Sequence, residues 1–143
     1  MIFDLTSLLS NNQQVLASAG SDNVIDLRGT GTVYGAAAAI TRDVGKGCRI
    51  PLRCQVSEAF NNLTSLTVSV QVDDNTAFSS AKTVFQSPAY ALADLTIGGR
   101  LLLPDQIPIG TDERYMRLFY TIAGAAPTTG RIVAGVTAAN QTN

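Results

Sequence analysis

The stretch LTSLTVSVQVDD, residues 63–74, alternates apolar and polar side chains from Leu66 to Asp73. This period is typical of a β-strand that turns one face to the core and the other to water. The Asp-Asp-Asn run at 73–75 is a turn signal that ends the strand. The apolar row is Leu66, Val68, Val70 and Val72, and the polar row is Thr67, Ser69, Gln71 and Asp73. The sequence therefore predicts a strand with one buried face.

The same period recurs along the chain. Residues 112–124, DERYMRLFYTIAG, place Met116, Leu118, Tyr120 and Ile122 on one face. Further strands are expected at 23–27, 47–56, 82–87, 99–104 and 130–138, separated by segments rich in glycine, proline, aspartate and threonine. About eight short strands without alternating helices predict an all-β protein, an antiparallel jelly roll or β-sandwich with little helix. We expect residues 1–143 to form a single domain of this kind.

Three segments are less regular than the expected strands. Residues 6–18 space their leucines in a loosely helical way, so residues 1–18 are expected to form an N-terminal arm or a short helix. The alanine run within 33–43 fits a helix, a small-residue strand or a loop. The polar residues 139–143 are expected to form a flexible tail.

The expected strand GCRIPLRCQV has Arg49 and Arg53 on its outward face. Pro51 lacks an amide donor, which favours an edge strand or a bulge. Cys48 and Cys54 lie six residues apart, about 20 Å along a strand, which is too far for a disulfide. Both are predicted to be buried thiols that act as small hydrophobic residues. The inward row is Cys48, Ile50, Leu52, Cys54 and Val56.

Charge and hydropathy exclude several kinds of partner. The formal net charge is −1 and the sequence pI is about 5.2, which gives no electrostatic footprint for DNA or RNA. No apolar run approaches the roughly 18–20 residues of a membrane span. The N-terminus lacks the basic region of a signal peptide. We therefore expect a soluble protein made in the cytoplasm, with neither nucleic acid nor a membrane as its partner.

Catalytic and metal-binding patterns are scarce. The chain has no histidine, and so lacks the commonest general base and metal ligand. Its two cysteines do not have the C-x-x-C spacing of a zinc site. The carboxylate pairs at 73–74 and 112–113 adjoin turn residues, where solvated carboxylates are ordinary. We expect no enzymatic activity, no metal and no cofactor, which leaves a binding or structural role.

The cationic residues favour protein contacts. Eight of the ten basic residues are arginine, and only 15% of the chain is charged, against roughly 25% in an average soluble domain. Protein interfaces favour arginine and aromatic residues over lysine. The candidate contact residues are Arg49 and Arg53 on one strand, and Tyr115, Arg117 and Phe119 on another.

The outward row of the 112–124 strand has two interpretations. In the first interpretation, a contact with another subunit is formed, or supported, by Tyr115, Arg117 and Phe119. In the other interpretation, Arg117 pairs with an acidic residue of the next strand while the aromatic rings fill a second, minor core.

An ordered series of segments resembles a known family. It consists of MIFDLTSLLSNNQ at 1–13, NVIDL at 23–27, SPAYALADL at 87–95, GGRLLLP at 98–104 and RYMRLFYTIAGAAPTTGRIVAGVT at 114–137. The series is similar to the small capsid cement, or decoration, proteins of podovirus-like tailed phages, the group typified by the cement protein of a Bordetella phage. The resemblance covers nearly the whole chain, and the C-terminal run is its most specific part.

The resemblance implies a jelly roll without activity or cofactor that self-associates as a homodimer. It implies a structural virion protein, made in the host cytoplasm, that binds the outside of an icosahedral capsid and bridges major capsid protein subunits to stabilise the expanded shell. No binding residue is carried over from the family. The alternative is a jelly-roll module that binds a carbohydrate or another ligand, with Tyr34, Tyr90 and Tyr115 as aromatic platforms.

Overall fold

Strands account for nearly all the regular structure of the computed structural model, which describes residues 3–29, 31–40, 42–46 and 49–138. They are β1 (Phe3–Gln14), β2 (Ala19–Gly20), β3 (Ile25–Asp26), β4 (Leu52–Glu58), β5 (Leu63–Asp73), β6 (Lys82–Gln86), β7 (Tyr90–Ala91), β8 (Arg100–Leu101), β9 (Tyr115–Gly124) and β10 (Arg131–Thr137). A single 3-10 turn in those residues, η1 (Leu92–Asp94), follows β7. The described chain is all-β, as the sequence predicts.

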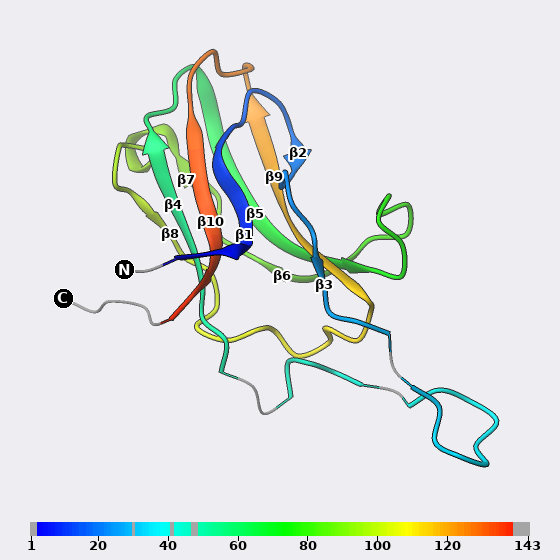
Figure 1. Cartoon of the computed structure of the whole chain (residues 1–143). Coiled ribbons are helices and arrows are strands. Elements are labelled where there is room, and N and C mark those ends of the chain that lie inside the picture. The colour runs from blue at the N-terminus through cyan, green and yellow to red at the C-terminus, as the bar shows by residue number, and fades with distance from the viewer. Residues whose placement is uncertain (1–2, 30, 41, 47–48, 139–143) are drawn as a thin grey trace.

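The strands form two antiparallel sheets (Figure 1). One has the order β1-β10-β4-β8. In the other, β2 and β3 both pair with β9, β9 pairs with β5, and β6 and β7 both pair with β5. If β2–β3 and β6–β7 are each counted as one interrupted strand, each sheet has four strands. Successive strands then change sheet except at β5 and β6–β7, which is the order of a jelly roll. The expected fold is confirmed, and the strand order is a finding of the structure.

The core lies between the sheets and contains the predicted inward rows. On β5 and β9 the fully buried members are Leu66, Val68, Val70, Val72, Met116, Leu118 and Tyr120. On the opposite sheet, Leu52, Cys54, Val56, Ile132 and Ala134 face them. Cys54 is a free thiol whose pKa burial raises. Cys48 and the tail at 139–143 lie outside the described residues.

The N-terminal segment differs from the helix expectation. Residues 3–14 form the edge strand β1, which pairs with β10. Its register shifts between Leu8 and Ser10 and again between Ser10 and Gln13. Asn12 has a positive φ of 55°. These irregularities break strict alternation, so the leucines of this segment do not recur at every second position in the sequence. Pairing with β10 decides the structure.

The strand expected at 47–56 is shorter and more central than predicted. β4 begins at Leu52 and lies between β10 and β8, so the edge-strand prediction is wrong. Pro51 precedes the strand, where no ladder bond needs its missing amide hydrogen. The strands expected at 23–27 and 99–104 are also shorter, since only β3 and β8 pair there.

A buried polar network joins the two sheets. Tyr120 Oη on β9 lies 2.7 Å from Ser10 Oγ on β1, and Ser10 donates to Gln13 Oε1 at 2.6 Å. The Gln13 amide is oriented by Nε2, which donates to the Gly20 carbonyl, and by Oε1, which accepts from the Asp22 N–H. Because Ser10 has one proton and gives it to Gln13, Tyr120 donates to Ser10. Desolvation raises the pKa of Tyr120, which keeps this donor protonated.

Substitutions in this network have unequal expected costs. Ser10→Ala leaves the buried Tyr120 hydroxyl without its acceptor, and should lower the free energy of unfolding by about 1–3 kcal/mol. Tyr120→Phe removes the donor while Ser10 keeps Gln13, so it should cost less, about 1 kcal/mol. Urea denaturation of both variants measures the difference. A larger loss for Tyr120→Phe would contradict the assigned direction of donation.

Candidate interaction surfaces

The outer face of the six-stranded sheet carries the first group of candidate residues. The ladder between β5 and β9 sets Arg117 opposite Gln71 and Phe119 opposite Ser69. Tyr115 lies opposite Asp73 at the end of this ladder. These positions alternate with the buried row on both strands, so the sequence placed them correctly on the outward face. They are nevertheless half-buried or buried, because other parts of the chain cover them.

Arg117 is the centre of this face. Its Nε donates to Gln71 Oε1 at 3.0 Å. Its guanidinium lies 4.1 Å from the ring centroid of Phe78 and 5.3 Å from that of Phe119. We call these four residues the Arg117 cluster. Desolvation lowers the pKa of Arg117, although the charge of Asp73 opposes the shift.

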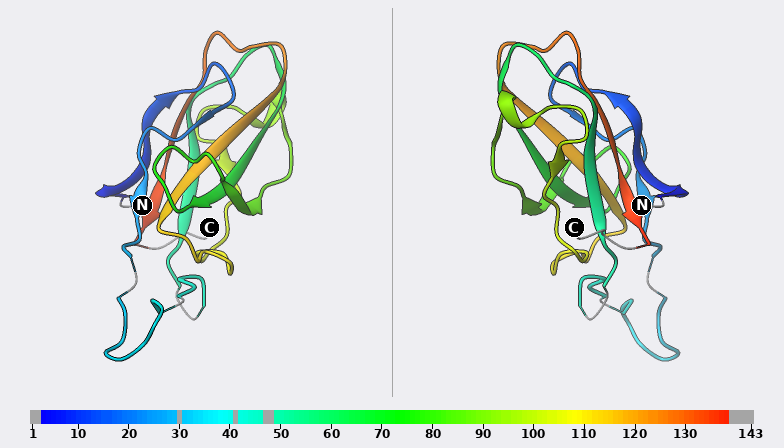
Figure 2. Two further views of the ribbon diagram at one scale, coloured as in Figure 1. Left: turned by 90° about the vertical axis from the view of Figure 1, so that its right-hand side faces the viewer. Right: turned by 90° about the vertical axis from the view of Figure 1, so that its left-hand side faces the viewer.

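The loop after β5 brings Phe78 over the sheet. Asp73 is 2% exposed and closes this loop, since its Oδ2 accepts the Ser80 N–H at 2.9 Å and its Oδ1 accepts the Ser80 hydroxyl at 3.0 Å. Asn75 Nδ2 also donates to Asp73 at 3.0 Å. Phe78 has a positive φ of 52° and is 6% exposed. Figure 2 (left) shows the green loop in front of β9.

The structure decides between the two interpretations of Arg117 only in part. The hydrogen-bond partner on the next strand is Gln71 rather than an acidic residue, and the aromatic rings form a small second core around the guanidinium. The sequence interpretation missed Phe78. Its only signal was the turn motif at 73–75, which indicates that the chain reverses there but does not say which ring lies over the sheet.

Tyr115 is held by contacts of its own. The Arg114 guanidinium lies 4.9 Å from the Tyr115 ring centroid. Arg114 also forms an ion pair with Asp26 on β3, with Nη2 and Oδ2 3.0 Å apart. The hydrogen bond from Arg114 lowers the pKa of Asp26. This end of β9 is therefore tied to β3.

Arg49 and Arg53 do not share a strand face. Arg49 is exposed and lies before β4, whereas Arg53 is half-buried on β4. Among the described residues, Arg53 Nε is buried and has no hydrogen-bond partner. Desolvation and then the charge of Arg100 lower the pKa of Arg53. Arg100 itself lies 3.7 Å from Asp105.

The tyrosines proposed as sugar platforms are dispersed. Tyr34 is fully exposed in the long connection between β3 and β4. Tyr90 pairs with Leu66 near one end of β5, and its hydroxyl accepts the Leu102 N–H at 2.7 Å. Tyr115 lies at the other end of β5. The structure does not bring the three rings together.

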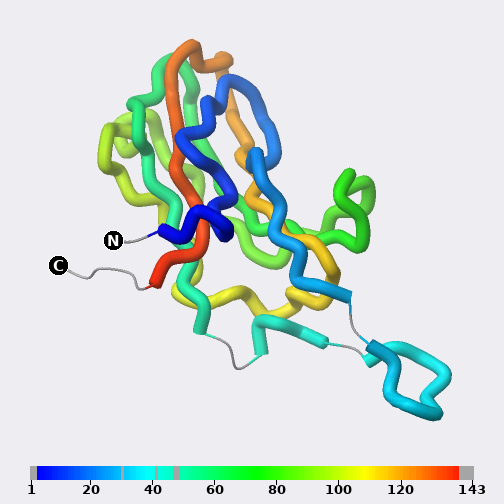
Figure 3. The backbone as a smooth tube through the Cα atoms, in the orientation of Figure 1, coloured from blue at the N-terminus to red at the C-terminus, as the bar shows by residue number. Residues whose placement is uncertain are grey.

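A loop of exposed residues projects from the sandwich. Every residue of 31–40, GTVYGAAAAI, is exposed, and none of them is charged. Figures 1 and 3 show this segment, in cyan and blue-cyan, reaching away from both sheets. An isolated bridge between Thr32 and Ala39 closes it. By its sequence the alanine run is compatible with a helix, a small-residue strand or a loop, and its described part forms a loop. We call this segment the 31–40 loop.

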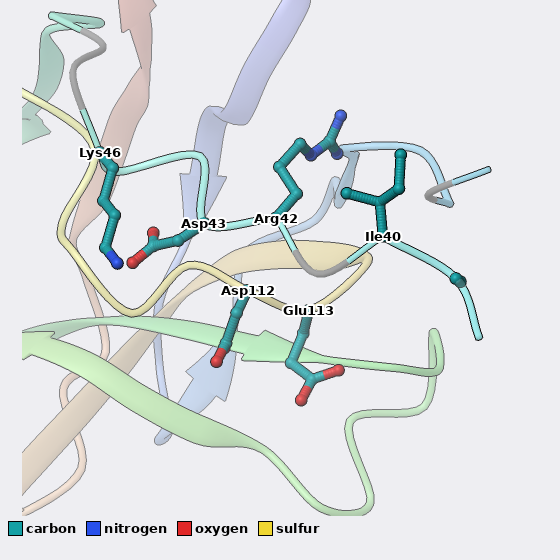
Figure 4. A pocket seen from close by; sticks show the side chains of 7 residues that line it. Ile40, Arg42, Asp43, Lys46, Asp112 and Glu113 are labelled. Atoms are coloured by element: carbon teal, nitrogen blue, oxygen red, sulfur yellow. The ribbon is translucent and has the colours of Figure 1, made fainter. Parts of the chain in front are cut away.

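An open pocket of about 590 Å³ lies at the base of the 31–40 loop (Figure 4). Its lining residues are Ala39, Ile40, Arg42, Asp43, Lys46, Asp112 and Glu113. Asp112 is bound by Lys82 Nζ at 2.9 Å, and Asp43 accepts backbone N–H groups. Figure 4 shows Arg42 turned away from the carboxylates of Asp112 and Glu113. Asp43 and Asp112 are therefore engaged in local structural contacts.

Neither a metal-binding cluster nor a membrane-spanning helix occurs among the described residues. Across 3–29, 31–40, 42–46 and 49–138, no three histidine, cysteine, aspartate or glutamate side chains converge in a way that could hold a metal ion. In the same part of the chain, no helix has the length and apolar character needed to cross a bilayer.

The strand order defines the class of this protein. It is a two-sheet jelly roll in which one outer sheet face is partly covered by a loop of the same chain. The family comparison then gives the relationship: the family Bbp16, a family of Bordetella phage proteins, matches residues 9–136. The chain belongs to this family. The matched segment begins within β1 and ends within β10, so it covers the sandwich. A comparison with curated proteins found no match.

A double-mutant cycle tests the Arg117 cluster. Arg117→Met removes the guanidinium, its charge and its bond to Gln71, and should cost about 1 kcal/mol of unfolding free energy. Phe78→Leu keeps an apolar side chain under the loop but removes the ring. Because both variants remove the same cation–π contact, the double variant should cost about 0.5–1 kcal/mol less than the sum. Strictly additive losses would show that the ring and the guanidinium are uncoupled.

The Asp73 carboxylate predicts an acid-dependent stability. Desolvation acts to raise its pKa, but hydrogen bonds with Asp74, Ser80 and Asn75 outweigh this and lower it. A lowered folded-state pKa stabilises the protein above the unfolded-state value near 4, and this stabilisation is lost as pH falls through the folded value. Melting temperatures from pH 7 to pH 2.5 should fall less steeply for Asp73→Asn. Parallel profiles would contradict a lowered pKa.

Proposed function

We propose that the chain is a capsid cement, or decoration, protein that binds the outside of an icosahedral phage shell and bridges major capsid protein subunits. Membership of the Bbp16 phage family is the observation that carries this proposal. The ordered segments that resemble cement proteins support it. The jelly roll is also a fold that recurs in viral capsid domains.

The proposed mechanism is preferential binding to one state of the shell. A protein that binds the expanded lattice more tightly than the unexpanded one stabilises the expanded lattice by the difference in binding free energy. A homodimer that engages two lattice sites gains effective concentration for the second contact, so each contact can be weak. This role needs no catalytic group or cofactor, and its partners are the major capsid protein and a second copy of the chain.

The candidate contact residues divide by how they are held. Arg49 is exposed and is proposed to contact a neighbouring subunit directly. Arg117 and Phe119 are engaged with Gln71 and Phe78, so we assign them a supporting role, in which they hold the loop after β5 against the sheet. Support of this kind holds in place the surface that the loop presents. A surface that is already rigid loses less entropy on binding.

Co-sedimentation with emptied, expanded shells encoded by the same genome tests this function. We expect saturable binding at a copy number fixed by the lattice, and weaker binding to unexpanded shells. At a free concentration of 100 times Kd, each occupied site should stabilise the expanded state by about 2.7 kcal/mol. The temperature at which the shells disassemble should therefore rise. Absent binding, or equal binding to both forms, would refute the proposed mechanism.

A further inference from the structure

The 31–40 loop is presented on a fixed base. On its C-terminal side, Asp43 Oδ2 accepts the Gly110 N–H at 2.8 Å, and the Val44 N–H donates to the Thr111 carbonyl at 3.0 Å. On its N-terminal side, the Leu27 N–H donates to the Arg114 carbonyl at 2.8 Å. Both flanks are thus tied to the segment that leads into β9. The segments that flank the loop are therefore fixed to the sandwich.

Arg42 joins the two flanks of the loop to each other. Its Nη2 donates to the backbone carbonyls of Leu27 and Arg28, the latter at 3.1 Å. Arg28 has a positive φ of 69°, an uncommon conformation for a residue with a side chain. A backbone outlier kept by surrounding bonds often marks a functional segment. Here it accompanies the turn of the chain away from β3 and into the loop.

The loop itself is closed but uncovered. The Ile40 N–H donates to the Gly31 carbonyl at 3.1 Å, and the Ala36 N–H donates to the Val33 carbonyl at 2.9 Å. These bonds satisfy part of the backbone without burying side chains. Val33 is 56% exposed, Ile40 is 52% exposed and Tyr34 is fully exposed. A projecting group of apolar side chains does not stabilise an isolated chain in water. Contiguous exposed groups of this kind mark contact sites.

We propose that the 31–40 loop is an attachment element that inserts Val33 and Tyr34 into an apolar, uncharged groove on a subunit of the capsid shell. This inference rests on the proposed function. The chemistry of the groove follows from the loop, which has no charge of its own to pair with a buried charge of the partner. Tyrosine suits the role because it supplies a large contact area and is enriched among dominant interface residues.

The size of the loop favours a shell subunit over a second copy of the chain. Stable two-body interfaces use roughly 20–30 residues a side. The loop offers ten residues, 31–40, which is too few to hold a dimer together by itself. On a lattice the same small contact is sufficient, because other contacts of the bound protein raise its effective concentration. A dimer would need a larger surface elsewhere on the sandwich.

The test compares two variants for binding to expanded shells. Val33→Ser/Tyr34→Ser removes the apolar groups of the loop, and Ile97→Ser, at a site 73% exposed before β8, is the matched control. Both should keep the melting temperature of the parent chain, since they alter exposed side chains. The loop variant should bind at least about tenfold more weakly, and the control within about twofold.

The outcomes separate this inference from the proposed function. If the parent chain binds shells and the loop variant binds equally well, the attachment role is wrong while the cement function stands. If the parent chain does not bind, both fail. If sedimentation velocity shows that the loop variant loses self-association but keeps its affinity for shells, the occupant is a second copy and the inference is overturned.

Protection from trypsin provides an independent readout. Arg28 and Arg42 bracket the loop, and both are exposed in the free chain. Cleavage after these residues, followed by mass spectrometry, should slow at least about tenfold when the protein is bound to shells, since a docked loop is withdrawn from the protease. Unchanged cleavage in the bound protein would show that the loop stays free, and would overturn the inference.

Discussion

The antiparallel ladder between β5 and β9 is the constraint on which the rest of the structure depends. Its register places Val68 opposite Tyr120 on the core side and Gln71 opposite Arg117 on the outer side. A shift of one residue would turn every side chain of a strand to the wrong face. The core, the Ser10–Tyr120 network and the Arg117 cluster therefore share one register. Burial of the apolar row against the four-stranded sheet keeps that register in place.

The outer face of this ladder explains an aromatic and cationic row that an ordinary half-exposed strand would not carry. The loop after β5 returns over the sheet, because Asp73 accepts hydrogen bonds from Ser80 and Asn75 and fixes the turn. Phe78 then covers the Arg117 guanidinium. A guanidinium held between aromatic rings and an amide is stable when half-buried, because it is planar and more weakly hydrated than an ammonium group. Within the chain, this row therefore makes structural contacts.

The sandwich is a rigid platform for segments that leave it. Loops on rigid scaffolds commonly carry binding function, and the 31–40 loop is the described segment that Figures 1 and 3 show farthest from the sheets. Its anchors at Arg42 and Asp43 connect it to the segment leading into β9. Membership in a phage family and an anchored apolar projection are the observations on which the proposed attachment role rests.

The sequence by itself determined the all-β class and the buried rows of β5 and β9, because a period of two is a property of the strand backbone. It missed β1, where register shifts break that period, and the central position of β4, since Pro51 lies just outside the strand. Only the tertiary structure decided that Phe78 covers Arg117 and that 31–40 stands clear of the sandwich. Both depend on contacts between segments distant in the chain, which no local pattern encodes.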